Sequence, residues 1–528
     1  MLSPARAAVL LAALLLPIPF IVAACSSHLP ASQAGGDASA DAEGDDAGEG
    51  GAVLAPPPIT RTETEAQLAP QRAACAFDAG AWPAQTIGTD YPVGSDIPIN
   101  HVIVIMQENR SFDHYLGRLV AQGYYNAGDF TSGGGGDAGG GDAGGEGGAG
   151  DAAPGSGFSH SDQLDGPPPG WSNPDGTGGT VVPHADNEYC YGVNHSWDAQ
   201  HDDYDNGLND HFVTQNNPDG QRTFFYEDDT VIPFYYALAN TFSVGDRYFC
   251  SVLSSTWPNR FFLMAATSFG IGDNSFATVD TAAHPAAQIF SLLEEGGHTW
   301  KDYTDGPHMV EFFPYFGFTA DARSHYEDIK CGLLGDIQNG TLPDVSFVMG
   351  DEVDEDSDEG PSDLPGIGGQ LVETIIRTLF ASPSWKDTAV FITYDENGGI
   401  ADHVEPAPAC LPDSYPPHDA NGNPLTPGQF DQTGFRVPFL VVSPYARAHY
   451  ASHLVHDHSS ITRFIETRFG LPALTGRDAN ALPPLEMFDF QNPPFMTPPT
   501  ITATTTVPPA ILTQCKQVLA PLSCSADN

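Results

Sequence analysis

The stretch from His101 to Gly117, HVIVIMQENRSFDHYLG, changes from apolar to polar within a few residues. Its run VIVIM lacks polar alternation, which is typical of a strand covered on both faces, as in a parallel sheet. The polar residues that follow therefore lie at the carboxyl end of a strand. In open α/β sheets ligand crevices form at this edge, because the loops that leave the strands diverge there. One such junction can also be an ordinary strand-to-helix loop, so other segments must decide.

Apolar strands alternate with amphipathic helices up to about residue 490. The expected strands include 345–350, 389–394 and 439–443, and the expected helices include 366–381 and 458–469. This alternation predicts an α/β fold with a central, mostly parallel sheet flanked by helices. A chain of 528 residues is long enough to bury a large core.

The chain is strongly acidic, with 19 Lys plus Arg against 68 Asp plus Glu and a formal net charge of -49. This balance argues against nucleic acid, or an anionic membrane surface, as an electrostatic partner. The charge is better explained by solubility.

Asp395 and Glu396 follow directly on the expected strand 389–394, with Gly398 and Gly399 allowing the backbone to turn. Adjacent carboxylates at a strand end repel each other unless a cation lies between them. The pair therefore indicates either a metal site or a solvated acidic turn.

Thr256 precedes Pro258, a residue that suits the first turn of a helix, so the Thr256 hydroxyl is expected at or near a helix N-terminus. That position suits a nucleophile that attacks phosphate, but it also suits a residue that only caps the helix. His195 and His403 lie in similar polar stretches, and each is a weak signal by itself.

Several long motifs occur together and in order: HVIVIMQENRSFDHYLG, NHSW, STWPNRFFL, LPDVSFV, YDENGGIADHV, and VPFLVVSPYAR followed by DHSSITRFIETRFGLP. In this order the chain resembles the bacterial phosphoesterase family of phospholipases C and acid phosphatases, over about residues 98–490. The resemblance implies an alkaline-phosphatase-like core with a divalent metal ion, of unknown identity, at the carboxyl edge of the sheet.

Carried over motif by motif, the resemblance implies that Thr256 is a nucleophile that forms a phosphothreonine and also contacts the metal. The other implied metal ligands are Glu108, Asn109, Asp395 and Glu396. His195 and His403 are implied contacts of the phosphate or the leaving group. The implied substrate is a phosphate ester or a phospholipid.

The chain departs from the family at Glu359-Gly360-Pro361, where a Glu-His-Pro segment is usual. Gly360 removes one expected imidazole near the phosphate. Three functions therefore stay open: a phospholipase C that cleaves phosphodiesters, an acid phosphatase that cleaves monoesters, and a surface-tethered binding lipoprotein with impaired catalysis.

Residues 1–24 have an early Arg6, a long apolar segment broken by two prolines, and VAA before Cys25. This pattern predicts a lipoprotein signal peptide rather than a spanning helix, with Cys25 as the lipid-modified residue. We therefore expect an exported bacterial lipoprotein, anchored to a membrane and facing the periplasm or the cell surface.

Composition divides the remaining chain. An acidic Gly/Ala/Pro-rich tether is expected at 25–85, the phosphoesterase catalytic domain at 86–490 and a tail at 491–528. The catalytic domain contains a Gly-rich insertion at 131–158, which is expected to be disordered. Cys515 and Cys524 are the disulfide pair that closeness in sequence favours, and the other pairings cannot be deduced.

Lipid modification can be tested at Cys25. If Cys25 is acylated, the protein should partition with membranes and extract into detergent, and Cys25→Ser should release it into the soluble fraction. Mass spectrometry that finds an unmodified N-terminus near residue 25 would contradict the expectation.

Overall fold

An eight-stranded sheet forms the centre of the structure. The computed structural model describes residues 54–124, 164–185, 192–274, 288–313, 319, 321–350, 364–510 and 512. The strands lie in the order β12-β6-β11-β10-β1-β9-β7-β8. Their bounds are β1 His101–Gln107, β6 Ser243–Gly245, β7 Trp300–Thr304, β8 Tyr326–Glu327, β9 Val345–Met349, β10 Thr388–Tyr394, β11 Phe439–Val442 and β12 Tyr450–Ser452. Two small ladders pair β2 (Asn173–Pro174) with β3 (Thr180–Val181) and β4 (His184–Ala185) with β5 (Phe225–Tyr226).

The sheet is mostly parallel, as predicted. β1 is parallel to β9 and β10, β7 is parallel to β8 and β9, and β12 is parallel to β6. β11 is the exception, because it is antiparallel to both β10 and β6. The strands expected at 345–350, 389–394 and 439–443 correspond to β9, β10 and β11.

β1 lies inside the sheet and pairs with β10 along its whole length, from His101 opposite Thr388 to Gln107 opposite Tyr394. The side chains from Val102 to Met106 are all buried, which explains why the run has no polar alternation. Since the two strands are parallel and in register, they end side by side. The polar residues that follow each strand are therefore neighbours.

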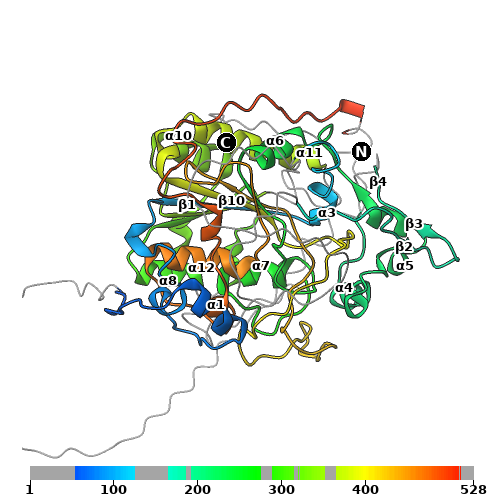
Figure 1. Ribbon diagram of the computed structural model, residues 1–528, viewed down its shortest axis with the longest axis horizontal. Helices are drawn as coiled ribbons and strands as arrows, with labels where there is room; N and C mark the ends of the chain where they lie inside the picture. The colour runs from blue at the N-terminus through cyan, green and yellow to red at the C-terminus, as the bar shows by residue number, and fades with distance from the viewer. Residues whose placement is uncertain are drawn as a thin grey trace, which may run out of the picture. The chain divides into compact units, whose positions relative to one another are not determined.

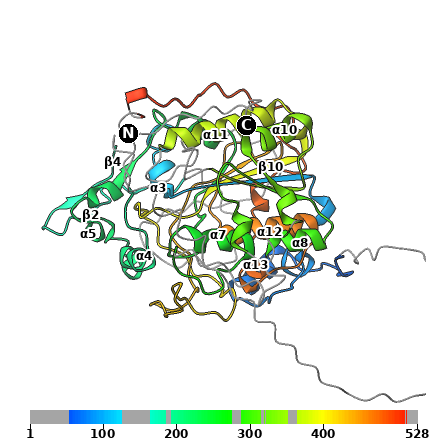
Figure 2. The same ribbon diagram turned by 180° about the vertical axis from the view of Figure 1, so that it is seen from behind.

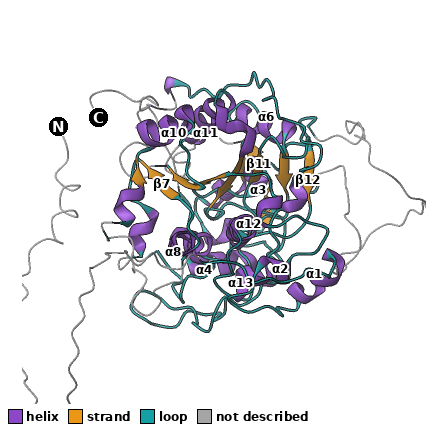
Figure 3. Ribbon diagram, turned by 90° about the vertical axis from the view of Figure 1, so that its left-hand side faces the viewer, coloured by secondary structure: helices purple, strands orange, loops and turns teal. Residues whose placement is uncertain are grey.

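Helices cover both faces of the sheet (Figure 1, Figure 3). One layer contains α6 (Pro233–Thr241), α10 (Leu334–Asn339) and α11 (Pro365–Phe380). The other contains α7 (Thr256–Ala265), α8 (Ile289–Glu295) and α12 (His458–Phe469), and Figure 2 shows the same layers from behind. The shorter or peripheral helices are α1 Glu65–Ala73, α2 Pro83–Thr86, α3 Phe112–Tyr115, α4 Trp197–Tyr204, α5 Phe212–Gln215 and α13 Gly476–Asn480.

The two expected helices match the structure closely. The helix expected at 366–381 is α11, and the helix expected at 458–469 is α12, which begins after the N-cap Asp457 and ends at Gly470 in a left-handed conformation. Within the described residues, no helix combines the length and the apolar composition that crossing a membrane requires.

The expected tether boundary at residue 85 is too late. The described residues from Leu54 onward belong to the same compact unit as the sheet, and α1 and α2 are part of this unit. Leu68 of α1 is buried, and Arg463 of α12 donates a hydrogen bond of 2.6 Å to Thr86 Oγ1. Composition alone does not reveal this, because an acidic, Pro-containing segment can still bury side chains against a neighbouring surface.

Part of the expected tail also belongs to the folded body. Residues 501–505 lie along α11, where Arg377 donates to the carbonyl oxygens of Ile501 and Ala503 at 3.0 and 2.6 Å. The backbone N–H of Thr505 donates to Glu373 at 2.8 Å. The expected insertion at 131–158, Cys25, Cys515 and Cys524 lie outside the described residues.

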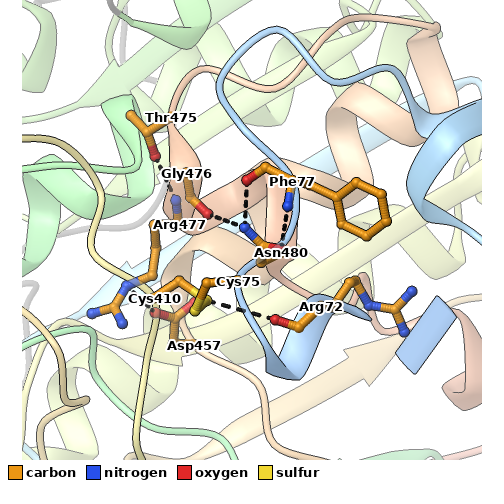
Figure 4. The surroundings of a disulfide bond; sticks show 9 residues. All are labelled: Arg72, Cys75, Phe77, Cys410, Asp457, Thr475, Gly476, Arg477 and Asn480. Atoms are coloured by element: carbon orange, nitrogen blue, oxygen red, sulfur yellow. Dashed lines mark hydrogen bonds and ion pairs between the residues drawn. A yellow bond between two sulfur atoms is a disulfide. The ribbon is translucent and has the colours of Figure 1, made fainter. Parts of the chain in front are cut away.

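A disulfide joins Cys75, just after α1, to Cys410, 335 residues later (Figure 4). Near it, the side chain of Asn480 in α13 accepts from the Phe77 N–H at 3.1 Å and donates to the Phe77 carbonyl at 2.7 Å. These bonds attach the N-terminal helical segment to the body. Cys250 is a free, buried cysteine.

Removing this cross-link should destabilise the domain. The double variant Cys75→Ser/Cys410→Ser should lower the free energy of unfolding by about 2–5 kcal/mol, because the unfolded chain regains the freedom of a long loop. Urea unfolding of oxidised wild-type and variant protein measures the difference. An unchanged midpoint and slope would show that the bond does not constrain the unfolded chain.

Candidate active site

The ends of β1 and β10 bring two pairs of predicted metal ligands together, Glu108 with Asn109 and Asp395 with Glu396. The Asp395 N–H donates to the Gln107 carbonyl at 3.0 Å, which extends the strand pairing by one step. The Asn109 N–H then donates to Asp395 Oδ1, also at 3.0 Å. Glu108 and Asn109 therefore lie directly beside Asp395 and Glu396.

The loop after β10 needs its two glycines. Gly398 and Gly399 have φ of 65° and 71°, in the left-handed region that favours glycine. A Cβ on Gly398 would lie 2.7 Å from the Asn109 carbonyl oxygen, and one on Gly399 would lie 2.5 Å from that of Asn194. The turn thus packs against both the β1 loop and the segment that carries His195. Asn109 itself has φ of 61°, a conformation that asparagine tolerates better than most residues.

Thr256 is the first residue of α7, after the N-cap Ser255, and is buried. Its hydroxyl donates to Glu108 Oε1 at 2.6 Å. Arg260 lies one turn further along α7 and donates to the other oxygen, Glu108 Oε2, at 2.5 Å. The Arg260 Nε is also 3.4 Å from Asp395 Oδ2. The nucleophile candidate and a buried guanidinium therefore share one carboxylate.

Glu396 connects the strand ends to His195. Its Oε2 accepts from the Gly398 N–H at 2.6 Å and from Gln200 Nε2 at 3.0 Å. Its Oε1 lies 3.7 Å from His195 Nε2. The His195 Nδ1 is 2.8 Å from the Val193 carbonyl oxygen, which can only accept, so Nδ1 carries a hydrogen and Nε2 faces Glu396.

Three carboxylates are buried together here, those of Glu108, Asp395 and Glu396. Burial, reinforced by the charge of Glu108, raises the pKa of both Asp395 and Glu396 well above the ordinary values, and Arg260 opposes this only in part. Keeping these three carboxylates ionised side by side is unfavourable unless further positive charge is supplied.

Three buried oxygens of the residues at these strand ends, Asn109 Oδ1, Asp395 Oδ2 and Glu396 Oε1, form no hydrogen bond within the described part of the chain. Carboxylate and amide oxygens that are not engaged in hydrogen bonds are the ligands that hard divalent cations prefer. The residues present therefore fit a divalent cation, and these oxygens are the atoms that could hold it.

His403 lies in a different charged cluster. Its Nδ1 is 2.7 Å from Asp113 Oδ2 and its Nε2 is 3.3 Å from Asp165 Oδ1. The buried Arg436 donates to Asp113 at 2.9 Å and to Asp402 at 2.8 Å. No hydrogen bond or ion pair among the described residues joins His403 to Thr256 or to the three buried carboxylates. Its role as a phosphate or leaving-group contact stays a prediction.

In the described part of the chain, two groups of carboxylates with a histidine have ligand atoms within 4.8 Å of one another: Asp113, Asp402 and His403, and Asp205, Asp210 and His211. In the first group Arg436 already supplies a positive charge. The second is only half buried. Neither group contains Thr256 or another nucleophile candidate, so the site at the ends of β1 and β10 is the better candidate active site.

Sequence reasoning assigned no role to several side chains behind this site. The position of Arg260 near the site could have been predicted, because Arg260 follows Thr256 by one helical turn in the motif STWPNR. Gln200 and Tyr248 gave no sequence signal.

His458 Nε2 donates to the Asp395 carbonyl at 2.7 Å, and the Tyr248 hydroxyl donates to His458 Nδ1 at 3.0 Å. Burial lowers the pKa of His458 to about 4, so this ring is neutral and fixes the backbone of Asp395. Gly360 lies outside the described residues.

The model of the Phosphoesterase family matches residues 99–472, a span that contains every strand of the large sheet and every residue of the site. The chain belongs to this family. It is therefore a hydrolase that acts on ester bonds.

Curated relatives agree with this assignment. Phospholipase C B of Mycobacterium tuberculosis is 30% identical over 484 residues, which cover 83% of this chain and 87% of the relative. The non-hemolytic phospholipase C of Burkholderia pseudomallei is 28% identical, covering 73% of this chain and 57% of its own. The plant relative, non-specific phospholipase C1 of Arabidopsis thaliana, is 34% identical over 47% of this chain and 48% of its own.

Among solved structures, a protein of the alkaline phosphatase superfamily from Vibrio parahaemolyticus aligns with 48% of this chain and 63% of its own. The identity is 12% and the TM-score is 0.31. An overlap this weak does not bear on function.

The His403 cluster should make stability depend on pH. Burial disfavours the imidazolium, but Asp113 and Asp165 outweigh it and raise the pKa of His403 to about 9. A folded-state pKa above the unfolded value of about 6.5 means that the stabilisation is complete below about pH 6.5 and is lost as pH rises through about 9. Wild type should therefore exceed His403→Asn in free energy of unfolding by roughly 3 kcal/mol more at about pH 6 than at about pH 9.5. Urea unfolding at both pH values measures this, and a difference that does not change with pH would contradict it.

Proposed function

We propose that this phosphoesterase is a phospholipase C, which cleaves a phosphodiester through a covalent intermediate on Thr256. The observation that carries the proposal is the 2.6 Å hydrogen bond from the Thr256 hydroxyl to Glu108, at the edge where Asp395 and Glu396 also lie. The names of the relatives from Mycobacterium and Burkholderia support phospholipid as the substrate class.

Glu108, Asn109, Asp395, Glu396 and Thr256 are the residues that would hold a divalent cation. A bound cation would supply positive charge that favours the Thr256 alkoxide and stabilises the phosphoryl oxygens. The identity of the cation is left open by the oxygen ligands, which suit calcium, magnesium or manganese and do not exclude zinc.

In the first step the Thr256 oxygen attacks phosphorus, and the bond from phosphorus to the diacylglycerol oxygen breaks. In the resting site Glu108 Oε1 accepts a hydrogen bond from the Thr256 hydroxyl, so it is within reach to accept the proton when Thr256 attacks. His195, partly exposed beside Glu396, can donate a proton from Nε2 to the leaving oxygen when its ring is charged.

In the second step water attacks the phosphothreonine diester. The bond from phosphorus to the Thr256 oxygen breaks, the phosphorylated headgroup leaves, and Glu108 returns its proton to the Thr256 oxygen, which restores the hydroxyl. A neutral His195 can accept the proton of the attacking water at Nε2, which returns the ring to its charged form.

A lipid anchor at Cys25 would suit this substrate, since it would hold the enzyme at a membrane. We include the anchor in the proposal on the strength of the sequence pattern alone.

Thr256→Val should abolish turnover while leaving the fold intact, because valine nearly matches threonine in volume but has no hydroxyl. We expect a loss of about three or more orders of magnitude in kcat on para-nitrophenyl phosphorylcholine. Thr256→Ser should retain part of the activity. Wild-type rates in the valine variant would leave Thr256 as a helix-terminus residue only.

The substrate class and the metal dependence of hydrolysis can be measured in the same assay. A phospholipase C should prefer para-nitrophenyl phosphorylcholine to para-nitrophenyl phosphate, and a chelator should suppress the reaction. The opposite preference would favour an acid phosphatase. Folded wild-type protein that hydrolyses neither compound at any added divalent metal would favour the binding lipoprotein.

A further inference from the structure

Gln200 is a fully buried side chain of α4 that the proposed chemistry does not use. Its amide nitrogen lies within hydrogen-bond distance of three acceptors. These are the Ser254 carbonyl at 2.7 Å, Glu396 Oε2 at 3.0 Å and, more weakly, the His195 carbonyl at 3.4 Å. All three can only accept, so the orientation of the amide is determined by its surroundings.

The three acceptors come from three separate segments of the chain. Ser254 lies two residues before Thr256, Glu396 follows β10, and His195 precedes the N-cap of α4. Each segment carries one component of the site: the nucleophile, a candidate metal ligand and the candidate acid. The amide nitrogen of Gln200 is thus within hydrogen-bond distance of all three segments.

The bond to Glu396 selects which of its oxygens faces the site. Oε2 is held by Gln200 and by the Gly398 N–H, whereas Oε1 has no hydrogen bond among the described residues and lies 3.7 Å from His195 Nε2. A neutral amide achieves this without adding a positive charge that would compete with a cation for the same carboxylate. A lysine or arginine in this place would neutralise Glu396 instead.

We propose that Gln200 is a positioning residue of the active site. It fixes the rotation of the Glu396 carboxylate and the spacing between that carboxylate, His195 and the segment that leads to Thr256. This role rests on the proposed function, because it assumes that Glu396 serves as a ligand of a divalent cation.

The test compares Gln200→Met, which keeps the length of the side chain and removes its donor, with Gln370→Met. Gln370 in α11, which is partly buried, is the control, because its amide also donates to a carbonyl, that of Thr505 at 3.2 Å, and none of its described hydrogen bonds reaches a residue of the site. Binding of Mn²⁺ to the purified full-length proteins is followed by loss of the free-Mn²⁺ electron paramagnetic resonance signal. Turnover is measured with para-nitrophenyl phosphorylcholine at saturating Mn²⁺.

Gln200→Met should raise the Mn²⁺ Kd about ten- to a hundredfold, and kcat should stay about tenfold or more below wild type at saturating Mn²⁺ with little change in KM. Gln370→Met should leave both quantities at wild-type values. A merely structural role would lower the melting temperature of Gln200→Met but leave the Mn²⁺ Kd of the folded protein unchanged. If Gln200→Met does not fold, Gln200→Glu replaces it, and its kcat should fall by a similar factor, because a carboxylate cannot donate to Ser254 or Glu396.

The outcomes separate the two proposals. If wild type binds Mn²⁺ and is active, and the folded Gln200 variant matches it in Mn²⁺ Kd and kcat, the positioning role is wrong and the proposed function stands. If wild type neither binds Mn²⁺ nor hydrolyses the diester, the metal-dependent function is wrong, and the positioning role is overturned with it.

Discussion

The parallel, in-register pairing of β1 with β10 is the constraint on which the site depends. Because both strands end at the same level, Glu108 and Asn109 meet Asp395 and Glu396 at one edge of the sheet, although they are separated by almost 300 residues of chain. A shift of one residue would also turn each buried side chain to the opposite face. The core that fixes the register therefore fixes the site as well.

The site in turn buries more carboxylate groups than Arg260 alone can neutralise. If Glu108, Asp395 and Glu396 were all ionised, they would carry three negative charges against the one positive charge of Arg260, and this is why burial raises the pKa of Asp395 and Glu396. Buried charge of one sign destabilises a folded protein. His458, Gln200 and the Gly398 N–H hold these groups in place without adding a positive charge, so a divalent cation is what would favour the ionised forms of all three carboxylates.

The sequence predicted those features that depend on local patterns. Unbroken apolar runs identified β1, β9, β10 and β11, and the family resemblance implied that the residues following β1 and β10 share a metal site. It did not reveal that β11 is antiparallel, because an apolar run carries no direction. Gln200 acts through contacts made only in three dimensions, and nothing in the residues around it marks them. The pairing of Cys75 with Cys410 could not be derived either, and the segment before residue 86 was misjudged because composition does not show what a neighbouring surface can cover.

The link between Cys75 and Cys410 also has a consequence for how the chain is made. Synthesis proceeds from the N-terminus, so Cys75 exists before its partner for the time needed to add 335 residues. At typical elongation rates this interval is about 15–70 s. Throughout it, any disulfide that Cys75 forms is with a wrong partner. The segment that carries α1 is therefore covalently fastened only late in synthesis or after it, and correct maturation requires either that its thiol stays reduced or that early pairings are exchanged.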